Sequence, residues 1–168
     1  MKLYVHGPDL LDHFAEKEDG SAFAAGAPDQ SRANLRRWIA RYCEARGCDG
    51  LIFFDDCGPA EVRPPTERVG RVTVTNLPYG RDAWMEMAGQ ANRSAMQEQT
   101  LVVTADHRLI RALERGRAKV VAPEQFVARA RQGMGRSDEE LAAEPDEKFS
   151  GLSEEEVDLW LEFFKRKE

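Results

Sequence analysis

Aspartates follow several short apolar segments of this sequence, and acidic side chains in such places could bind a metal ion. They are Asp9, Asp55, Asp82 and Asp106. Carboxylates at neighbouring strand ends repel one another unless a cation lies between them. Hard oxygen ligands suit Mg²⁺ or Mn²⁺, and such an ion can activate water and stabilise a leaving oxygen in phosphodiester cleavage. The pattern therefore predicts a divalent metal site with hydrolytic chemistry.

Each aspartate also has a structural explanation, which the sequence leaves open. Asp82 and Asp106 stand where helices are expected to begin, so either can be an N-cap that accepts hydrogen bonds from backbone N–H groups. Asp55 and its neighbour Asp56 can be turn residues, and Asp56 would be a supporting acid in a metal site. A common site is favoured by the shared position of the acids at strand ends, not by any single one.

The first apolar segment ends in His6 and is expected to break in a turn at Gly7-Pro8, before Asp9. Two interpretations of this stretch stay open. In a relocated site, Asp9 supplies a carboxylate and His6 an imidazole ligand, which favours Mn²⁺ over Mg²⁺. In a degenerate site, His6 is a neutral hydrogen-bonded imidazole, Asp9 caps the turn, and the remaining carboxylates bind metal weakly.

Short apolar runs rich in β-branched or aromatic residues predict the strands that must position these acids. They span residues 2–6, 50–54, 71–75, 100–104 and 118–122. Helical patterns lie between them, at about residues 35–42, 84–95, 107–115 and 123–132. This alternation predicts an α/β fold with a helix-covered parallel sheet, whose functional groups gather at the carboxyl ends of the strands. Residues 16–30 and 57–70 are expected to be an insertion and a long loop.

Composition fits one domain with a core, since the chain has 168 residues and is 42% hydrophobic. The formal net charge is -6, but residues 137–168 hold 12 of the 30 acids and only 4 of the 24 bases. The remainder carries a net charge of +2 and contains arginine clusters. Local basic faces for a nucleic acid are therefore compatible with the acidic total, although solvated helix faces also explain such arginines.

The sequence predicts a cytoplasmic protein with no membrane partner. No apolar run approaches the roughly 20 residues of a membrane helix, and the N-terminus lacks the pattern of a signal peptide. The cysteines Cys43, Cys48 and Cys57 are odd in number and lack a paired C-x-x-C arrangement. Reduced thiols at buried or half-buried positions are therefore expected.

The order and spacing of several stretches resemble the successive motifs of the YacP-like NYN domain family, which is related to the PIN ribonucleases. These stretches read YVHGPDLL, LIFFDD, GRDAWMEM and LVVTADHRLI. The resemblance covers residues 1 to about 132 and implies a PIN/NYN-like three-layer domain with a central, mainly parallel five-stranded sheet. It also implies a metal-dependent endoribonuclease that uses Mg²⁺ or Mn²⁺ and acts on RNA, including RNA associated with the ribosome.

The family's acids and the threonine before the last acid match residues of this chain. The matching residues are Asp55, Asp82, Asp106 and Thr104. His6 stands where the family has its first metal-binding aspartate, Asp9 replaces an asparagine, and Ala83 replaces a second acid of the third motif. Together, the residues and the resemblance predict a catalytic and metal-binding set of Asp9, Asp55, Asp82 and Asp106, with His6 as a further ligand and Thr104 in support. Arg81 and Arg108, beside these motifs, are predicted to contact RNA.

Two other classes of protein share parts of this pattern. The same fold without turnover would be an RNA- or ribosome-binding module, in which the substituted first motif marks a degenerate nuclease. Phosphotransfer and phosphatase folds also carry acids at strand ends, but they need a nearby lysine or a phosphate-binding loop. No lysine closes a predicted strand at its carboxyl end, and no glycine-rich phosphate motif is present.

The predicted domain spans residues 1–134, and an acidic linker with an amphipathic C-terminal helix is predicted over 135–168. Ser153 and Glu156 form a capping box at the start of this helix. Apolar side chains then recur at helical spacing, which makes the apolar face too rich to stay in water. Either the helix packs on its own domain or it docks on a partner chain.

Overall fold

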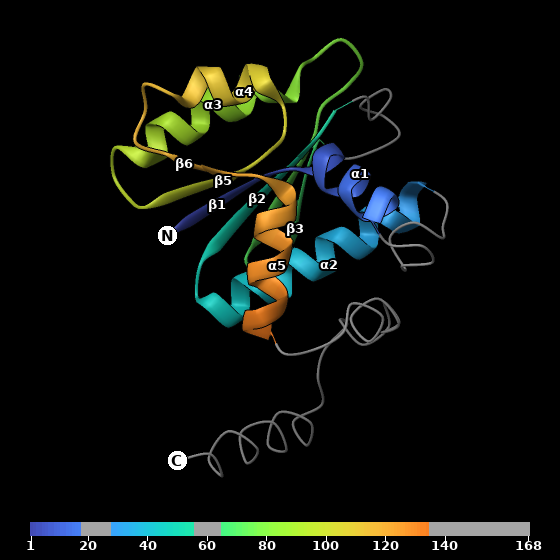
Figure 1. Ribbon diagram of the computed structural model, residues 1–168. Coiled ribbons are helices and arrows are strands. Elements are labelled where there is room, and N and C mark those ends of the chain that lie inside the picture. The colour runs from blue at the N-terminus through green and yellow to red at the C-terminus, as the bar shows by residue number, and fades with distance from the viewer. Residues whose placement is uncertain (18–27, 56–64, 135–168) are drawn as a thin grey trace, which may run out of the picture.

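A six-stranded sheet lies between two layers of helices (Figure 1). The computed structural model describes residues 1–17, 28–55 and 65–134. The strands are β1 (Lys2–His6), β2 (Asp49–Phe54), β3 (Thr66–Val69), β4 (Val72–Asn76), β5 (Thr100–Val103) and β6 (Lys119–Val121). The helices are α1 (Gly7–Lys17), α2 (Pro28–Arg46), α3 (Ala83–Ala95), α4 (His107–Leu113) and α5 (Pro123–Met134). The predicted α/β, three-layer architecture with a mainly parallel sheet is confirmed.

The strand order β3-β4-β2-β1-β5-β6 puts β1 at the centre of the sheet. All neighbouring strands run parallel except β3 and β4. The register pairs His6 with Phe53 and Val5 with Val103, so β1, β2 and β5 end at the same edge. The residues that follow these strands therefore meet at one carboxyl edge, as predicted.

The two faces of the sheet have cores of different composition. Helices α1, α2 and α5 cover one face, where Trp38 makes edge-to-face contacts with Phe14 and Phe126 at centroid distances of 5.6 and 5.9 Å. Helices α3 and α4 cover the other face, where α3 buries Met87 among alanines such as Ala91. Burial of these apolar surfaces is the main stabilising contribution to the fold, and it holds the loops of the carboxyl edge in place.

The sheet has one strand more than the predicted five, because part of the expected loop 57–70 is β3. This strand pairs antiparallel with β4, and Val69 is the register partner of Val72. Only two residues lie between those partners, and the first is Gly70, with φ of 55°. Two-residue hairpin connections favour a positive φ, which glycine adopts without steric cost.

A helix replaces the turn that was expected at Gly7-Pro8. Helix α1 begins directly after β1, and the first turn tolerates Pro8 because the N–H groups there have no intrahelical acceptor. A Cβ atom on Gly7 would lie 2.3 Å from the Phe54 ring, so only glycine lets the helix start so close to β2. Asp9 consequently lies in the first turn of α1, where a negative charge is favourable.

The cysteines of the described region are buried, free thiols, as predicted. Cys43 and Cys48 are 0% and 1% exposed, and burial raises the pKa of Cys43. Cys57, Asp56 and the predicted linker and helix over 135–168 lie outside the described residues. Among the helices that the structure describes, none is both long and apolar enough to span a bilayer.

Candidate functional site

The carboxyl edge places His6 between two of the predicted acids. Its Nδ1 atom lies 3.0 Å from Asp9 Oδ2, and its Nε2 atom lies 3.9 Å from Asp55 Oδ2. The imidazole is only 7% exposed. The contact of Nδ1 with Asp9 is an ion pair when the imidazole is protonated. His6 is therefore part of the acidic cluster, as either interpretation of the first motif requires.

Asp9 ties the start of α1 to the loop between β5 and α4. Its Oδ2 atom accepts hydrogen bonds from Thr104 Oγ1 and the Ala105 N–H, both at 2.6 Å, and from the Asp106 N–H at 3.3 Å. Thr104 Oγ1 also accepts from the Asp106 N–H at 3.0 Å. Thr104 thus contacts one of the predicted acids and the backbone of another, and its supporting role in a metal site stays a prediction.

The pKa values of His6 and Asp9 favour the charged form of both. Burial lowers the pKa of His6, but the contact with Asp9 and the charges of Asp55 and Asp106 outweigh it, so the pKa is raised. Burial likewise raises the pKa of Asp9, and the opposing effects of His6, Thr104 and the Ala105 N–H bring it below its usual value. Both pKa shifts therefore favour an imidazolium beside a carboxylate.

Asp106 is bound to Arg108 through both carboxylate oxygens. Oδ1 accepts from the backbone N–H of Arg108 at 2.8 Å and from its Nε at 3.2 Å, and Oδ2 accepts from Nη2 at 2.8 Å. The first of these bonds caps α4, so the N-cap explanation of Asp106 is confirmed. The hydrogen bonds from Arg108 hold the pKa of Asp106 below its usual value. A cation of the protein itself therefore neutralises this acid.

Asp55 and Asp82 are more open to solvent than the other predicted acids. The Asp55 side chain is 30% exposed, whereas Asp82 is exposed and precedes α3 without a side-chain capping hydrogen bond. The pKa of Arg108 is raised, mainly by its hydrogen bonds to Asp106. The negative charges of Asp106, Asp82 and Asp55 add to this effect. The acids of this edge thus share the guanidinium of Arg108 as a counter-charge.

The arrangement does not fit a hard divalent cation. Mg²⁺ and Mn²⁺ need several oxygen ligands that face one position. Asp9 Oδ2 already accepts from Thr104, Ala105 and Asp106, and both oxygens of Asp106 accept from Arg108. Within residues 1–17, 28–55 and 65–134, no group of three or more His, Cys, Asp or Glu side chains is arranged to hold a metal ion. Asp9 and Asp106 instead take protein donors as partners.

An aromatic and basic surface lies beside the acids, on the α3 and α4 side of the sheet. Tyr79 is 70% exposed in the loop before α3, and Arg81 in the same loop is also exposed. The guanidinium of Arg108 lies 5.5 Å from the ring centroid of Trp84. Sequence reasoning identified both arginines but missed Tyr79 and Trp84. The available signal for Tyr79 was an aromatic residue between Pro78 and Gly80, where neither helical nor strand periodicity explains it.

The strand order, the two helix layers and the acidic carboxyl edge define a three-layer α/β domain of YacP-like fold. The chain is similar to the crystal structure of Rae1 (YacP) from Bacillus subtilis, with a TM-score of 0.65 and 18% identity over 99% of this chain and 95% of that one. The crystal structure of a mutant form of Rae1 from the same organism matches with a TM-score of 0.62 and 18% identity over 80% of this chain and 77% of the other. No family model and no curated protein match the sequence. The similarity establishes the fold, and the NYN/PIN motifs stay a prediction.

Proposed function

We propose that the protein is an RNA-binding module with a YacP-like fold, in which internal partners occupy the acids of the former nuclease site. The main support is that Asp9 and Asp106 accept hydrogen bonds from Thr104, Ala105 and Arg108, which leaves their engaged oxygens poorly placed for a metal ion. The resemblance of the sequence motifs to the YacP-like family supports RNA as the ligand and the ribosome as its source.

The proposed RNA surface consists of Tyr79, Arg81, Trp84 and Arg108. Exposed aromatic rings stack on unpaired bases, while arginine side chains contact phosphates, so this combination suits single-stranded RNA. Tyr79 is 70% exposed, which means that its ring contributes little to the core. Arg108 is held by Asp106, and its exposed guanidinium is thereby fixed in direction. The surface has both the stacking and the electrostatic elements that RNA binding requires.

Fluorescence anisotropy of a labelled single-stranded RNA with the full chain tests this function. Tyr79→Ala should weaken binding by roughly 5- to 150-fold, the range expected when a stacked base loses its aromatic partner. The matched control is Met96→Ala, because Met96 is 77% exposed just beyond the far end of α3. If both variants bind RNA as tightly as the parent, this surface is not the binding site.

A metal-dependent endoribonuclease is the second candidate function. It is favoured by the exposure of Asp55 and by Asp82, which makes no capping bond with its own helix. Such an enzyme would require Arg108 to leave Asp106, and Arg108 is 62% exposed. Cleavage of RNA by the parent or by Arg108→Gln in Mg²⁺ or Mn²⁺, and its loss in Asp55→Asn, would support this candidate. Binding without cleavage under all these conditions supports the module.

A further inference from the structure

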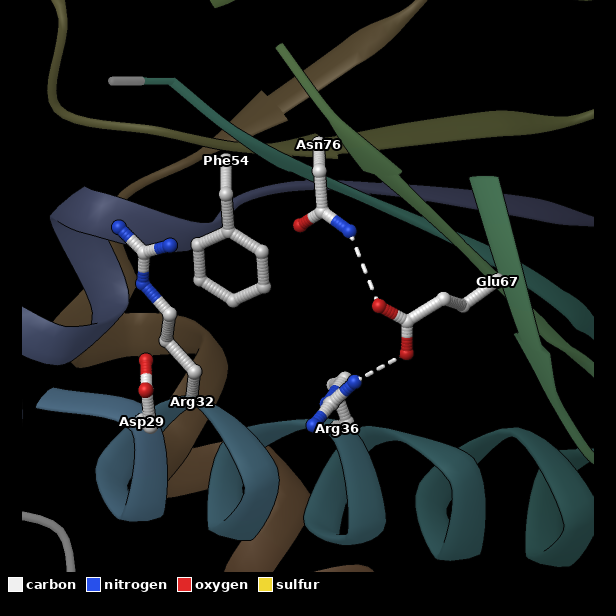
Figure 2. Close-up of a pocket in the computed structure, with 6 residues that line it drawn as sticks. All are labelled: Asp29, Arg32, Arg36, Phe54, Glu67 and Asn76. Carbon is white, nitrogen blue, oxygen red and sulfur yellow. Dashed lines mark hydrogen bonds and ion pairs between the residues drawn. The ribbon is translucent and has the colours of Figure 1, made fainter. Parts of the chain in front are cut away.

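A pocket of about 270 Å³ lies on the opposite face of the sheet from the proposed RNA surface, between α2 and the strands β2, β3 and β4 (Figure 2). It is lined by Asp29, Arg32, Arg36, Phe54, Glu67 and Asn76. Phe54 directly precedes Asp55, so the pocket adjoins the acidic cluster at the carboxyl edge. The polar residues of this pocket all lie outside the family motifs.

One wall of the pocket is flat and cationic. The guanidinium carbon of Arg32 lies 5.0 Å from the ring centroid of Phe54, and Figure 2 shows both side chains on the same side of the pocket. Phe54 is only 1% exposed, so its ring supports Arg32 from within the core and the guanidinium is the surface that a ligand can reach. Aromatic rings and guanidinium planes are the surfaces on which nucleobases stack. The wall therefore suits a planar heterocycle.

The opposite wall presents the carboxylate of Glu67 in a fixed orientation. Arg36 Nη1 donates to Oε2, and Asn76 Nδ2 donates to Oε1 at 3.1 Å. Each carboxylate oxygen has capacity for a second hydrogen bond. With both oxygens held in place, Glu67 can accept two parallel N–H bonds from a ligand, the geometry of bidentate recognition.

Guanine is the base whose edge matches such a carboxylate. Its N1–H and N2–H donors lie side by side, whereas adenine and cytosine each place an acceptor next to their amino group. Uracil has one N–H between two carbonyl acceptors. Each of these three bases would direct at least one lone pair at Glu67, which costs binding energy. The acceptor pattern of Glu67 therefore distinguishes guanine from the other bases.

The charge of the pocket favours a neutral ring over a phosphate. The formal charges of Arg32 and Arg36 are balanced by those of Asp29 and Glu67. The Arg36–Glu67 pair joins α2 to β3 and is only partly buried, with side chains 26% and 27% exposed, so the carboxylate stays within reach of a ligand.

We propose that this pocket binds a guanine base. The source would be a guanine turned out of single-stranded RNA, in which case the inference rests on the proposed RNA function. A free guanine nucleotide offers the same ring and is the other source. In both cases the base stacks on the guanidinium of Arg32, which Phe54 supports, and donates its N1–H and N2–H groups to Glu67.

The test uses uridine decamers that carry one central G, A or C, together with guanosine monophosphate as free ligand. The decamer with G should bind the full chain more tightly than the one with A, by roughly tenfold, as expected for one bidentate base contact. Glu67→Gln keeps the shape of the side chain but replaces one acceptor with a donor, so it should abolish the preference. The matched control is Glu98→Gln, whose carboxylate is also ion-paired, with Lys2 at 3.5 Å beside the amino ends of β1 and β5.

The outcomes separate this inference from the proposed function. RNA binding with equal affinity for all decamers, or a G preference that survives Glu67→Gln, overturns the guanine pocket and leaves the RNA module intact. Binding of guanosine monophosphate that is lost in Glu67→Gln, without RNA binding, supports the pocket and overturns the RNA module. If neither RNA nor guanosine monophosphate binds, the guanine pocket and the RNA module are both overturned. If thermal melting shows that Glu67→Gln is not folded, Arg32→Leu is tested instead. An unchanged preference for guanine in Arg32→Leu also counts against the pocket.

Discussion

The carboxyl edge of the sheet has two halves in which aspartate side chains have different surroundings. The half beside β1 and β5 is called the buried half, and the half beside β2 and β4 is called the exposed half. In the half beside β1 and β5, Asp9 and Asp106 are 15% and 13% exposed and accept several hydrogen bonds from the protein. In the half beside β2 and β4, Asp55 is 30% exposed and Asp82 is exposed without a capping bond. At this edge, the less exposed aspartates, Asp9 and Asp106, accept hydrogen bonds from nearby backbone and side-chain donors, whereas Asp55 and Asp82 are more open to solvent.

The largest expected effect is that of Asp9→Ala, which should lower the free energy of unfolding by about 3 kcal/mol. The substitution leaves the buried imidazolium of His6 without its partner and removes the acceptor of Thr104 and Ala105. Asp82→Ala, in the other half, should change stability by less than about 0.5 kcal/mol. Urea unfolding of the two variants measures the contrast, and equal losses would show that the halves do not differ.

Restoring the family's aspartate with His6→Asp should have the next largest effect. It brings a third carboxylate next to Asp9 and Asp55 and removes the imidazolium, so stability should fall by about 2 kcal/mol without a divalent ion. Added Mn²⁺ should then restore about 1.4 kcal/mol at ten times its dissociation constant, while the parent stays indifferent. Thermal melting with and without Mn²⁺ checks this. If the ion leaves the melting temperature of the variant unchanged, the two halves do not converge on one cation position.

The half beside β1 and β5 should also make stability depend on pH, because the pKa values of His6 and Asp9 are shifted in the folded state. The pKa of His6 is raised, so its contribution is present below about pH 6.5 and is lost as pH rises through the folded-state pKa. The pKa of Asp9 is lowered, so its contribution is present above about pH 3.9 and is lost as pH falls through its folded-state pKa. Stability contributed by the pair should therefore be greatest between these values.

Urea unfolding of the parent and of His6→Asn between pH 4 and 9 measures this dependence. The decline above about pH 6.5 should be present in the parent and much smaller in the variant, because asparagine does not titrate. Asp82→Asn serves as the control from the exposed half and should keep the decline of the parent. A parent curve that is flat through this range would contradict the charged state of the pair.

Arg108→Gln should have only a small effect on stability, because Arg108 is 62% exposed in its ion pair with Asp106. The loss should be small compared with that of Asp9→Ala, because solvent screens exposed ion pairs. If Arg108 contacts a phosphate, the dependence of RNA affinity on salt should fall by about one released counterion. Unfolding and anisotropy titrations at several salt concentrations measure both. A loss of stability as large as that of Asp9→Ala would show that Arg108 is as important for the fold as Asp9.

The predictable parts of the fold were those with strong local periodicity. Each of the parallel strands is an apolar run, and such runs are recognisable without tertiary context. Helix α1 was missed because Gly7-Pro8 is typical of a turn, although Leu10 and Phe14 follow at helical spacing. Strand β3 was missed because this edge strand reads TERV, in which three consecutive polar residues leave Val69 as the one apolar position.

The sequence by itself determined that His6, Asp9, Asp55 and Asp106 come together, because parallel strands bring their carboxyl ends to one edge. Only the tertiary structure decided which acids are engaged. Thr104 meets Asp9 across 95 positions of the chain, and Arg36 meets Glu67 across 31. Contacts between residues so far apart leave no local pattern, because they depend on the angle at which each helix packs on the sheet. The same applies to the guanine pocket, whose walls come from α2, β2, β3 and β4.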